Sequence, residues 1–105
     1  MYKQISAAEA SILQQKGEAV LLDVREEQEL EICRIEGALH IPLNEIPERY
    51  ETLPEGKPVI VLCHHGMRSS KAQQFLISKG LDNIINMQGG IHAWSTDVDP
   101  QMTQY

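Results

Sequence analysis

The chain has 105 residues, of which 42% are hydrophobic and 23% charged, and its formal net charge is −6. This length suits one compact domain, and the negative charge argues against nucleic-acid binding, which relies on basic surfaces. No apolar stretch approaches the ~20 residues that span a bilayer, and residues 1–4 lack the apolar core of a signal peptide. We therefore expect a single-domain cytoplasmic protein that binds neither nucleic acid nor membrane.

The first part of the chain predicts a short strand at residues 2–5 followed by a helix. Ser6 and Glu9 have the spacing of a capping box, which opens a helix. The helix is expected to end near Gly17. Three of its side chains are expected to face the core: Ala10, Ile12 and Leu13.

Three further elements follow in order. Residues 19–24 form an unbroken apolar run that is typical of a parallel strand buried on both faces. Residues 26–34 predict a short helix with acidic residues in its first turns, where the helix dipole favours them. Residues 37–42 read as another short strand, and residues 43–53 as irregular chain or a brief helix broken by prolines.

The second half of the chain continues this alternation. Residues 58–63 predict a central strand, and a helix is expected to begin at Ser69 or Ser70 and to end at Lys79. A last strand at residues 83–87 precedes a final short helix at residues 91–94. The polar tail, residues 95–105, is expected to run over the surface.

Strands that alternate with helices imply parallel βαβ units, and hence an α/β fold with an open parallel sheet covered by helices on both faces. In such sheets, ligands bind beyond the carboxyl ends of the strands. Cys63 lies at one of these ends, and Asp23 and Arg25 lie at another. These three residues therefore predict a site at this edge of the sheet.

Cys63 ends the apolar run and is followed by a short loop of five residues, namely His64, His65, Gly66, Met67 and Arg68. A tight loop between a strand and a helix turns backbone N–H groups toward whatever it encloses. A thiol in that position ionises readily, helped by the charge of Arg68. Ser69 is a candidate N-cap of the helix. A cysteine that merely fills a core would not explain the glycine, arginine and serines that follow it.

Three motifs make the chain resemble a rhodanese, a single-domain sulfurtransferase. LDVR at residues 22–25 with GALHIP at 37–42 is similar to the amino-terminal signature, and GGIHAW at 89–94 to the carboxyl-terminal one. Residues 63–68 match the six-residue active loop. The resemblance implies one rhodanese-like domain over residues 1–105, with its core at about 5–94 and a surface tail at 95–105.

A closer resemblance involves EICRI at residues 31–35 and the tail at 98–105. Both look like the rhodanese domain fused behind ubiquitin-activating-type (MoeB/ThiF-like) adenylyltransferases, which serve molybdopterin, thiamine or thiolated-tRNA pathways. The resemblance implies a persulfide on Cys63, a small sulfur donor such as thiosulfate or a persulfide, and no cofactor. It also implies a protein donor or acceptor, such as a cysteine desulfurase or a ubiquitin-like sulfur carrier.

The chain departs from the family pattern in two places, at His64 and at the pair Cys33 and Arg34. His64 stands where thiosulfate-using members often carry arginine, which leaves Arg68 as the fixed cation of the loop and predicts poor use of thiosulfate. Cys33 and Arg34 replace the usual glycine and histidine. Cys33 is either a resolving thiol or a small buried residue on a helix, and we favour the second interpretation.

Two other functions stay open at this stage. Cysteine-dependent phosphatases use a similar cradle, a loop whose backbone N–H groups surround the bound anion, with the spacing Cys-x5-Arg. Cys63 and Arg68 have the spacing Cys-x4-Arg. The shorter loop makes a smaller ring, which suits one sulfur atom better than a tetrahedral phosphate. The third possibility is a non-catalytic persulfide carrier or regulatory binding module, which would keep Cys63 and differ in turnover.

The remaining polar candidates are less specific. His64 and His65 either tune the thiolate and meet an anionic donor, or are simply exposed loop residues. We expect no metal site on them, since the sequence offers no third ligand at a useful spacing. Asp23 and Arg25 are expected to tie the strand end to the loops.

Overall fold

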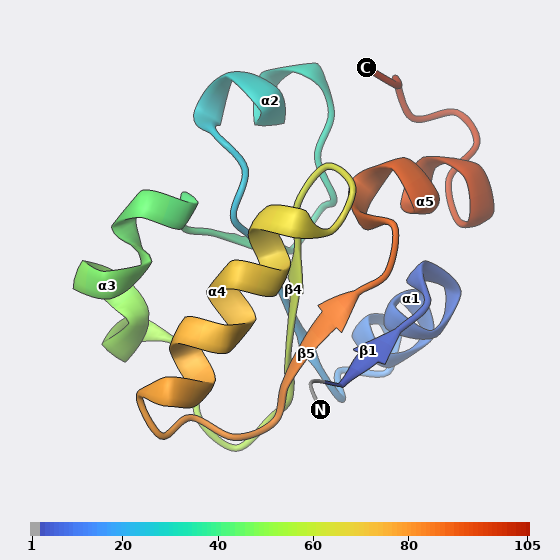
Figure 1. Ribbon diagram of the computed structural model, residues 1–105. Helices are drawn as coiled ribbons and strands as arrows, with labels where there is room; N and C mark the ends of the chain where they lie inside the picture. Colours follow the sequence, from blue (N-terminus) through green and yellow to red (C-terminus); the bar gives the residue numbers. More distant parts are fainter. Residues whose placement is uncertain (1–2) are drawn as a thin grey trace.

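The computed structural model describes residues 3–105. Within them the chain forms an open parallel sheet of five strands in the order β1-β5-β4-β2-β3. Helices cover both faces of this sheet (Figure 1). The predicted fold class is confirmed. The strands are β1 (Gln4–Ile5), β2 (Val20–Asp23), β3 (Leu39–His40), β4 (Val59–Leu62) and β5 (Ile84–Met87).

The helices divide into two layers and one end piece. α1 and α5 pack together on one face of the sheet, and α4 packs on β4 and β5 on the other face, where α3 also lies. α2 lies beyond the carboxyl ends of the strands, beside the loop that follows β4 (Figure 1). The helices are α1 (Ala7–Gln15), α2 (Glu27–Ile32), α3 (Ile46–Arg49), α4 (Met67–Ser78) and α5 (Gly90–Asp97), and 3₁₀ turns at Leu43–Glu45 and Tyr50–Thr52 flank α3.

Alternate residues of β4 point to the two faces of the sheet, as a strand with period 2 requires. Ile60 and Leu62 join one apolar cluster, which holds α1, α5 and the buried Trp94. Val61 and Cys63 join the other, which holds α3 and α4. Cys63 therefore faces the α4 side of the sheet, so the helix that follows it returns over its side chain.

The helix starts follow the expected chemistry in two places. Ser6 and Glu9 form the predicted capping box, in which the Ser6 hydroxyl accepts from the Glu9 N–H at 3.1 Å. Glu26 and Glu29 form a second one at the start of α2, where the Glu26 N–H donates to the Glu29 carboxylate at 2.9 Å. The second box fixes the orientation of Glu29, which matters for the site.

Several sequence-based expectations about individual residues are wrong. Ile12 is 53% exposed because it lies on the outer face of α1, opposite the buried Ala10. Pro47 does not break α3, since it occupies the first turn, where a missing N–H costs nothing. Cys33 is not on a helix: it follows α2 in extended conformation and is partly exposed.

Of the strand predicted at residues 2–5, Gln4 and Ile5 form β1. Tyr2 lies outside the described residues. Among the helices of residues 3–105, none has the length and apolar character needed to cross a membrane. Both cysteines, Cys33 and Cys63, are free thiols.

Candidate active site

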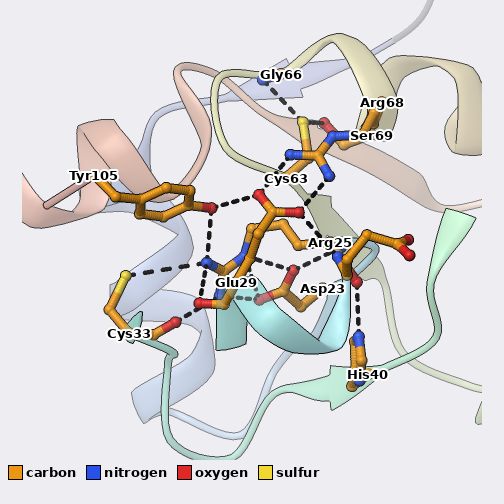
Figure 2. A network of polar contacts seen from close by, with 11 residues as sticks. Asp23, Arg25, Glu29, Cys33, His40, Cys63, Gly66, Arg68, Ser69 and Tyr105 are labelled. Atoms are coloured by element: carbon orange, nitrogen blue, oxygen red, sulfur yellow. Dashed lines mark hydrogen bonds and ion pairs between the residues drawn. The ribbon is translucent and has the colours of Figure 1, made fainter. Parts of the chain in front are cut away.

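Cys63 follows the carboxyl end of β4, and its thiol lies at the amino end of α4 (Figure 2). The side chain is buried, with 1% of the residue exposed. The backbone N–H of Gly66 donates to Cys63 Sγ at 3.0 Å. The amino end of α4 carries partial positive charge, so the local field favours an anionic sulfur at this position.

The helix begins earlier than the sequence predicts. Gly66 has φ +122° and occupies the N-cap position, so Met67 is already the first residue of α4. Such a φ is strained for any other residue, and here it lets the chain turn directly from the loop into the helix. The expectation that Ser69 caps the helix is therefore wrong, because Ser69 lies within the first turn.

Ser69 contacts the thiol instead of capping the helix. Its hydroxyl lies 3.4 Å from Cys63 Sγ and donates to Oδ1 of Asn86, on β5. Asn86 in turn donates to the Gly66 carbonyl at 3.4 Å. Both residues are buried. The Ser69 hydroxyl can thus accept from a thiol, or turn to donate to a thiolate, without leaving its place.

The amino end of α5 shapes the loop from the opposite side. The N–H groups of Ile91 and His92 donate to the carbonyls of Cys63 and His64 at 2.8 and 3.1 Å. These contacts tie the start of the loop to α5. Gly90 makes the approach possible, because a Cβ there would lie 2.4 Å from the Cys63 carbonyl oxygen and 2.5 Å from that of His64. This explains the second glycine of the carboxyl-terminal motif.

Arg68 is paired with a carboxylate of α2. Its Nη1 and Nη2 donate to the two oxygens of Glu29 at 2.6 and 2.8 Å, a bidentate geometry (Figure 2). The Arg68 hydrogen bonds lower the pKa of Glu29 to about 2, and they raise the pKa of Arg68. The fixed cation of the loop is therefore neutralised by a carboxylate and oriented by α2.

Asp23 and Arg25 form a buried ion pair beneath this layer. Arg25 Nη2 lies 2.7 Å from Asp23 Oδ2, and both side chains are shielded from solvent. The Arg25 guanidinium also donates to the backbone carbonyls of Glu29 and Cys33 at 3.3 and 2.8 Å. His40 reaches the Arg25 carbonyl through Nε2 at 2.7 Å. As expected, the pair ties the end of β2 to the adjoining segments.

Tyr105 joins this network from the tail. Its hydroxyl accepts from Arg25 Nη1 at 2.9 Å and donates to Glu29 Oε2 at 2.6 Å. Its ring stacks on His64, with centroids 3.9 Å apart and planes 9° apart. Burial raises the pKa of Tyr105 to about 12, so the phenol stays a neutral donor. The expectation of a mere surface tail is corrected here, since Ser95 is buried within α5 and Tyr105 reaches the loop.

His64, His65 and Met67 are the other side chains of the loop that follows Cys63. Burial, followed by the proximity of His65, lowers the pKa of His64 from its ordinary value. His65 and Met67 are exposed, Met67 by 77%. Both line a groove of about 620 Å³ that also touches Lys71, Gln74 and Gln88. Across residues 3–105, the His, Cys, Asp and Glu side chains form no group of three that could hold a metal ion.

Three residues of this site escape sequence reasoning: Glu29, Asn86 and Tyr105. Asn86 had a readable signal, since it is a polar residue near the end of an apolar strand. Glu29 had none, because the neighbouring Glu26, Glu27 and Glu31 look equivalent to it. Tyr105 was hidden in a polar tail.

The buried thiol beyond a parallel strand, held at a helix start, defines a cysteine-loop α/β domain. Residues 6–97 match the family described as rhodanese-like domain, and the chain belongs to that family. It is 37% identical over 94 residues to the thiosulfate sulfurtransferase GlpE of Coxiella burnetii, covering 90% of this chain and 88% of that one. The three sequence motifs thus identified the family correctly.

Two further relatives agree. The putative sulfurtransferase YtwF of Bacillus subtilis is 36% identical over 100 residues, covering 94% of this chain and 96% of that one. The crystal structure of a rhodanese-related protein from Thermoplasma volcanium is 36% identical, with a TM-score of 0.84 and coverage of 92% and 94%. The chain is accordingly a rhodanese-type sulfurtransferase.

Proposed function

We propose that this sulfurtransferase carries sulfane sulfur as a persulfide on Cys63 and passes it to a thiophilic acceptor or a protein sulfur carrier. The observation that carries the proposal is the placement of Cys63 Sγ at the start of α4, 3.0 Å from the Gly66 N–H. An anionic sulfur there meets oriented backbone dipoles that need no reorganisation during reaction. Loop residues 64–68 would form the wall of this cradle.

The first half-reaction forms the persulfide. The Cys63 thiolate attacks the sulfane sulfur of the donor, a new S–S bond forms, and the donor's own bond to that sulfur breaks. The leaving group departs with the bonding electron pair, as sulfite from thiosulfate or as a thiolate from a persulfide. The proton lost earlier by the thiol goes to solvent. The outer sulfur on Cys63 then bears the negative charge within the cradle.

The second half-reaction releases the sulfur. A nucleophilic acceptor, such as cyanide or a thiolate, attacks the outer sulfur, and the S–S bond to Cys63 breaks. Cys63 leaves as a thiolate, which the Gly66 N–H and the Ser69 hydroxyl are placed to stabilise. No group has to act as an acid or base at the reacting sulfur, whose contacts are the Gly66 N–H and the Ser69 hydroxyl.

The groove of about 620 Å³ beside His65 and Met67 is also lined by Gly66, whose N–H contacts Cys63 Sγ, and is the proposed approach for donor and acceptor. Lys71 and His65 lie along it, and a protein partner would meet the exposed Met67 first. The resemblance of the tail to adenylyltransferase-fused domains supports a protein acceptor. A cysteine desulfurase or a ubiquitin-like carrier is therefore the proposed protein partner.

A persulfide donor is favoured over thiosulfate. Glu29 neutralises Arg68 through both of its oxygens, so this guanidinium is not free to meet a doubly charged donor. The same pairing weighs against the phosphatase alternative, because Glu29 occupies the edge of the guanidinium that could otherwise bind phosphate oxygens. The non-catalytic carrier shares the proposed persulfide, and only turnover distinguishes it.

Intact mass tests the proposal. The protein is incubated with a cysteine desulfurase and cysteine, or with a small persulfide, and the excess donor is removed. We expect a gain of one sulfur atom that is lost on reduction and is absent from Cys63→Ser. An unmodified mass with every donor, together with hydrolysis of an aryl phosphate, would replace this proposal with the phosphatase.

A further inference from the structure

Tyr105 is connected to both ends of the loop that holds the thiol. Its ring lies flat on His64, the first residue after Cys63, at 3.9 Å. Its hydroxyl donates at 2.6 Å to Glu29, the carboxylate that holds Arg68, the last loop residue. Figure 2 shows this phenol between the Arg25 guanidinium and the Glu29 carboxylate. A single tail side chain thus contacts one end of the loop directly and the other through one intermediary.

The tail that presents Tyr105 is itself tied to the fold. The N–H of Asp99 donates to the Trp94 carbonyl at 2.9 Å, and that of Met102 to the Asp99 carbonyl at 3.0 Å. Met102 packs against the apolar cluster of α1 and α5, and Gln104 Nε2 donates to Ser95 Oγ at 3.0 Å. Because these contacts already order the tail, placing the phenol costs little additional conformational entropy.

The hydrogen-bonding roles at the phenol are determined by its neighbours. Arg25 is a donor, so the Tyr105 oxygen accepts from it, and the phenolic proton is left for Glu29. Glu29 has a pKa of about 2, lowered first by Arg68, and stays a carboxylate at neutral pH. With one oxygen accepting from both Tyr105 and Arg68, the Glu29 carboxylate is locked in the rotamer that points at the loop.

We propose that Tyr105 is a positioning residue for sulfur transfer: its ring holds His64 against the loop, and its hydroxyl holds the carboxylate that orients Arg68. This inference rests on the proposed function. Tyr105 does not contact Cys63, so its effect is transmitted through these two loop residues. Loss of Tyr105 should leave the fold intact, because the tail lies outside the sheet and the main helices.

The two halves of the proposal are separable by substitution. Tyr105→Phe removes the hydroxyl and keeps the stacked ring, while Tyr105→Ala removes both. Tyr50→Phe is the matched control: it deletes a tyrosine hydroxyl in the 3₁₀ turn Tyr50–Thr52, where the ring packs edge-on against Phe75, away from the loop.

The first readout is the imidazole titration of His64 by NMR, which needs no sulfur transfer. The groups that act on His64 are His65 and Arg68 of the loop, Glu29 of α2 and Tyr105 of the tail. His92 of α5 and Cys33 line the same small cavity. Removing the ring exposes the imidazole to water, so Tyr105→Ala should raise the pKa of His64 toward its ordinary value. Tyr105→Phe should leave this titration unchanged.

The second readout is steady-state sulfur transfer from a small persulfide to cyanide. Loss of one hydrogen bond to a charged group predicts a fall in kcat/KM of about 3- to 10-fold for Tyr105→Phe, and more for Tyr105→Ala. Tyr50→Phe should match the wild type in both readouts. A Tyr105→Ala protein that matches Tyr50→Phe in the His64 titration and in kcat/KM would overturn the inference.

The two proposals fail in different ways. A wild type that transfers no sulfur from any donor would end the proposed function, and the His64 titration would still decide whether Tyr105 positions the loop. If sulfur transfer is normal in the wild type and in Tyr105→Ala, while His64 also titrates identically in both, Tyr105 is only a surface contact.

Discussion

Arg68 and Glu29, 39 positions apart in the chain, form a bidentate ion pair with N–O distances of 2.6 and 2.8 Å. The pair joins the start of α4 to α2 directly above the thiol loop. Its side chains are 34% and 18% exposed, so it is shielded more than an ordinary surface pair. The arginine that ends the loop motif is therefore oriented by a carboxylate that belongs to no part of the motif.

The role of Cys63 is tested against the second cysteine. Cys63→Ser should reduce sulfane sulfur transfer to cyanide to below about 1% of wild type, because a hydroxyl at this position cannot form the persulfide. Cys33→Ser should stay within about twofold, since Cys33 contacts Arg25 mainly through its backbone carbonyl. Activity lost only in the Cys33 variant would contradict the assignment.

The Arg68–Glu29 pair predicts a geometric requirement. Arg68→Ala should lower kcat/KM about 10-fold, and Arg68→Lys should recover little of it, because an ammonium cannot bind both carboxylate oxygens in the same plane. Arg49→Ala serves as control, since it breaks an exposed i,i+4 pair with Glu45. Full activity in Arg68→Ala would mean that the backbone cradle suffices.

Glu29 predicts a pH dependence of stability. Its pKa is lowered in the folded state from 4.5 to about 2, so its contribution is fully present above pH 4.5 and is lost as the pH falls toward 2. Glu29→Gln should flatten the fall in the free energy of unfolding over this interval, measured by urea titration. Glu45→Gln should retain the wild-type slope, and equal slopes for the two variants would refute the prediction.

Gly90 predicts a steric cost. In Gly90→Ala the new methyl would lie 2.4 Å from the Cys63 carbonyl oxygen, at φ +58°, so the contact between α5 and the loop must open. We expect a loss of about 2–4 kcal/mol in the free energy of unfolding, with weaker sulfur transfer. Gly17→Ala is the control: it has φ +69° with open space around it, and should cost only about 1–2 kcal/mol. Equal losses would show that backbone strain alone decides.

His64 predicts a change in donor preference. His64→Arg adds a permanent cation beside the loop, which should lower the KM for thiosulfate by roughly 5-fold and change kcat less. Gln74→Arg is the control, since it adds the same charge on α4, in a groove that His64 does not line. An unchanged or higher KM for thiosulfate in His64→Arg would remove the electrostatic explanation.

The fold and the position of the site followed from local patterns. Apolar runs such as Val59–Leu62 predict buried parallel strands, and the carboxyl ends of such strands lie at one edge of the sheet. Cys63 and Arg25 could thus be assigned to the same edge before any coordinates. The capping box of Ser6 and Glu9 was equally readable, because its hydrogen bonds join residues three positions apart.

The partners of the functional side chains were decided only by the tertiary structure. The strand order β5-β4-β2 places Asn86 beside Ser69 and brings α2 over the loop. Of the four glutamates at positions 26, 27, 29 and 31, Glu29 is the one that the turn of α2 directs at Arg68. Tyr105 reaches Arg25 across 80 positions. Periodicity describes neighbours within one element, whereas these contacts depend on how separate elements pack. Hydrogen bonds between separate elements produce no regular residue spacing that could be recognised in the sequence.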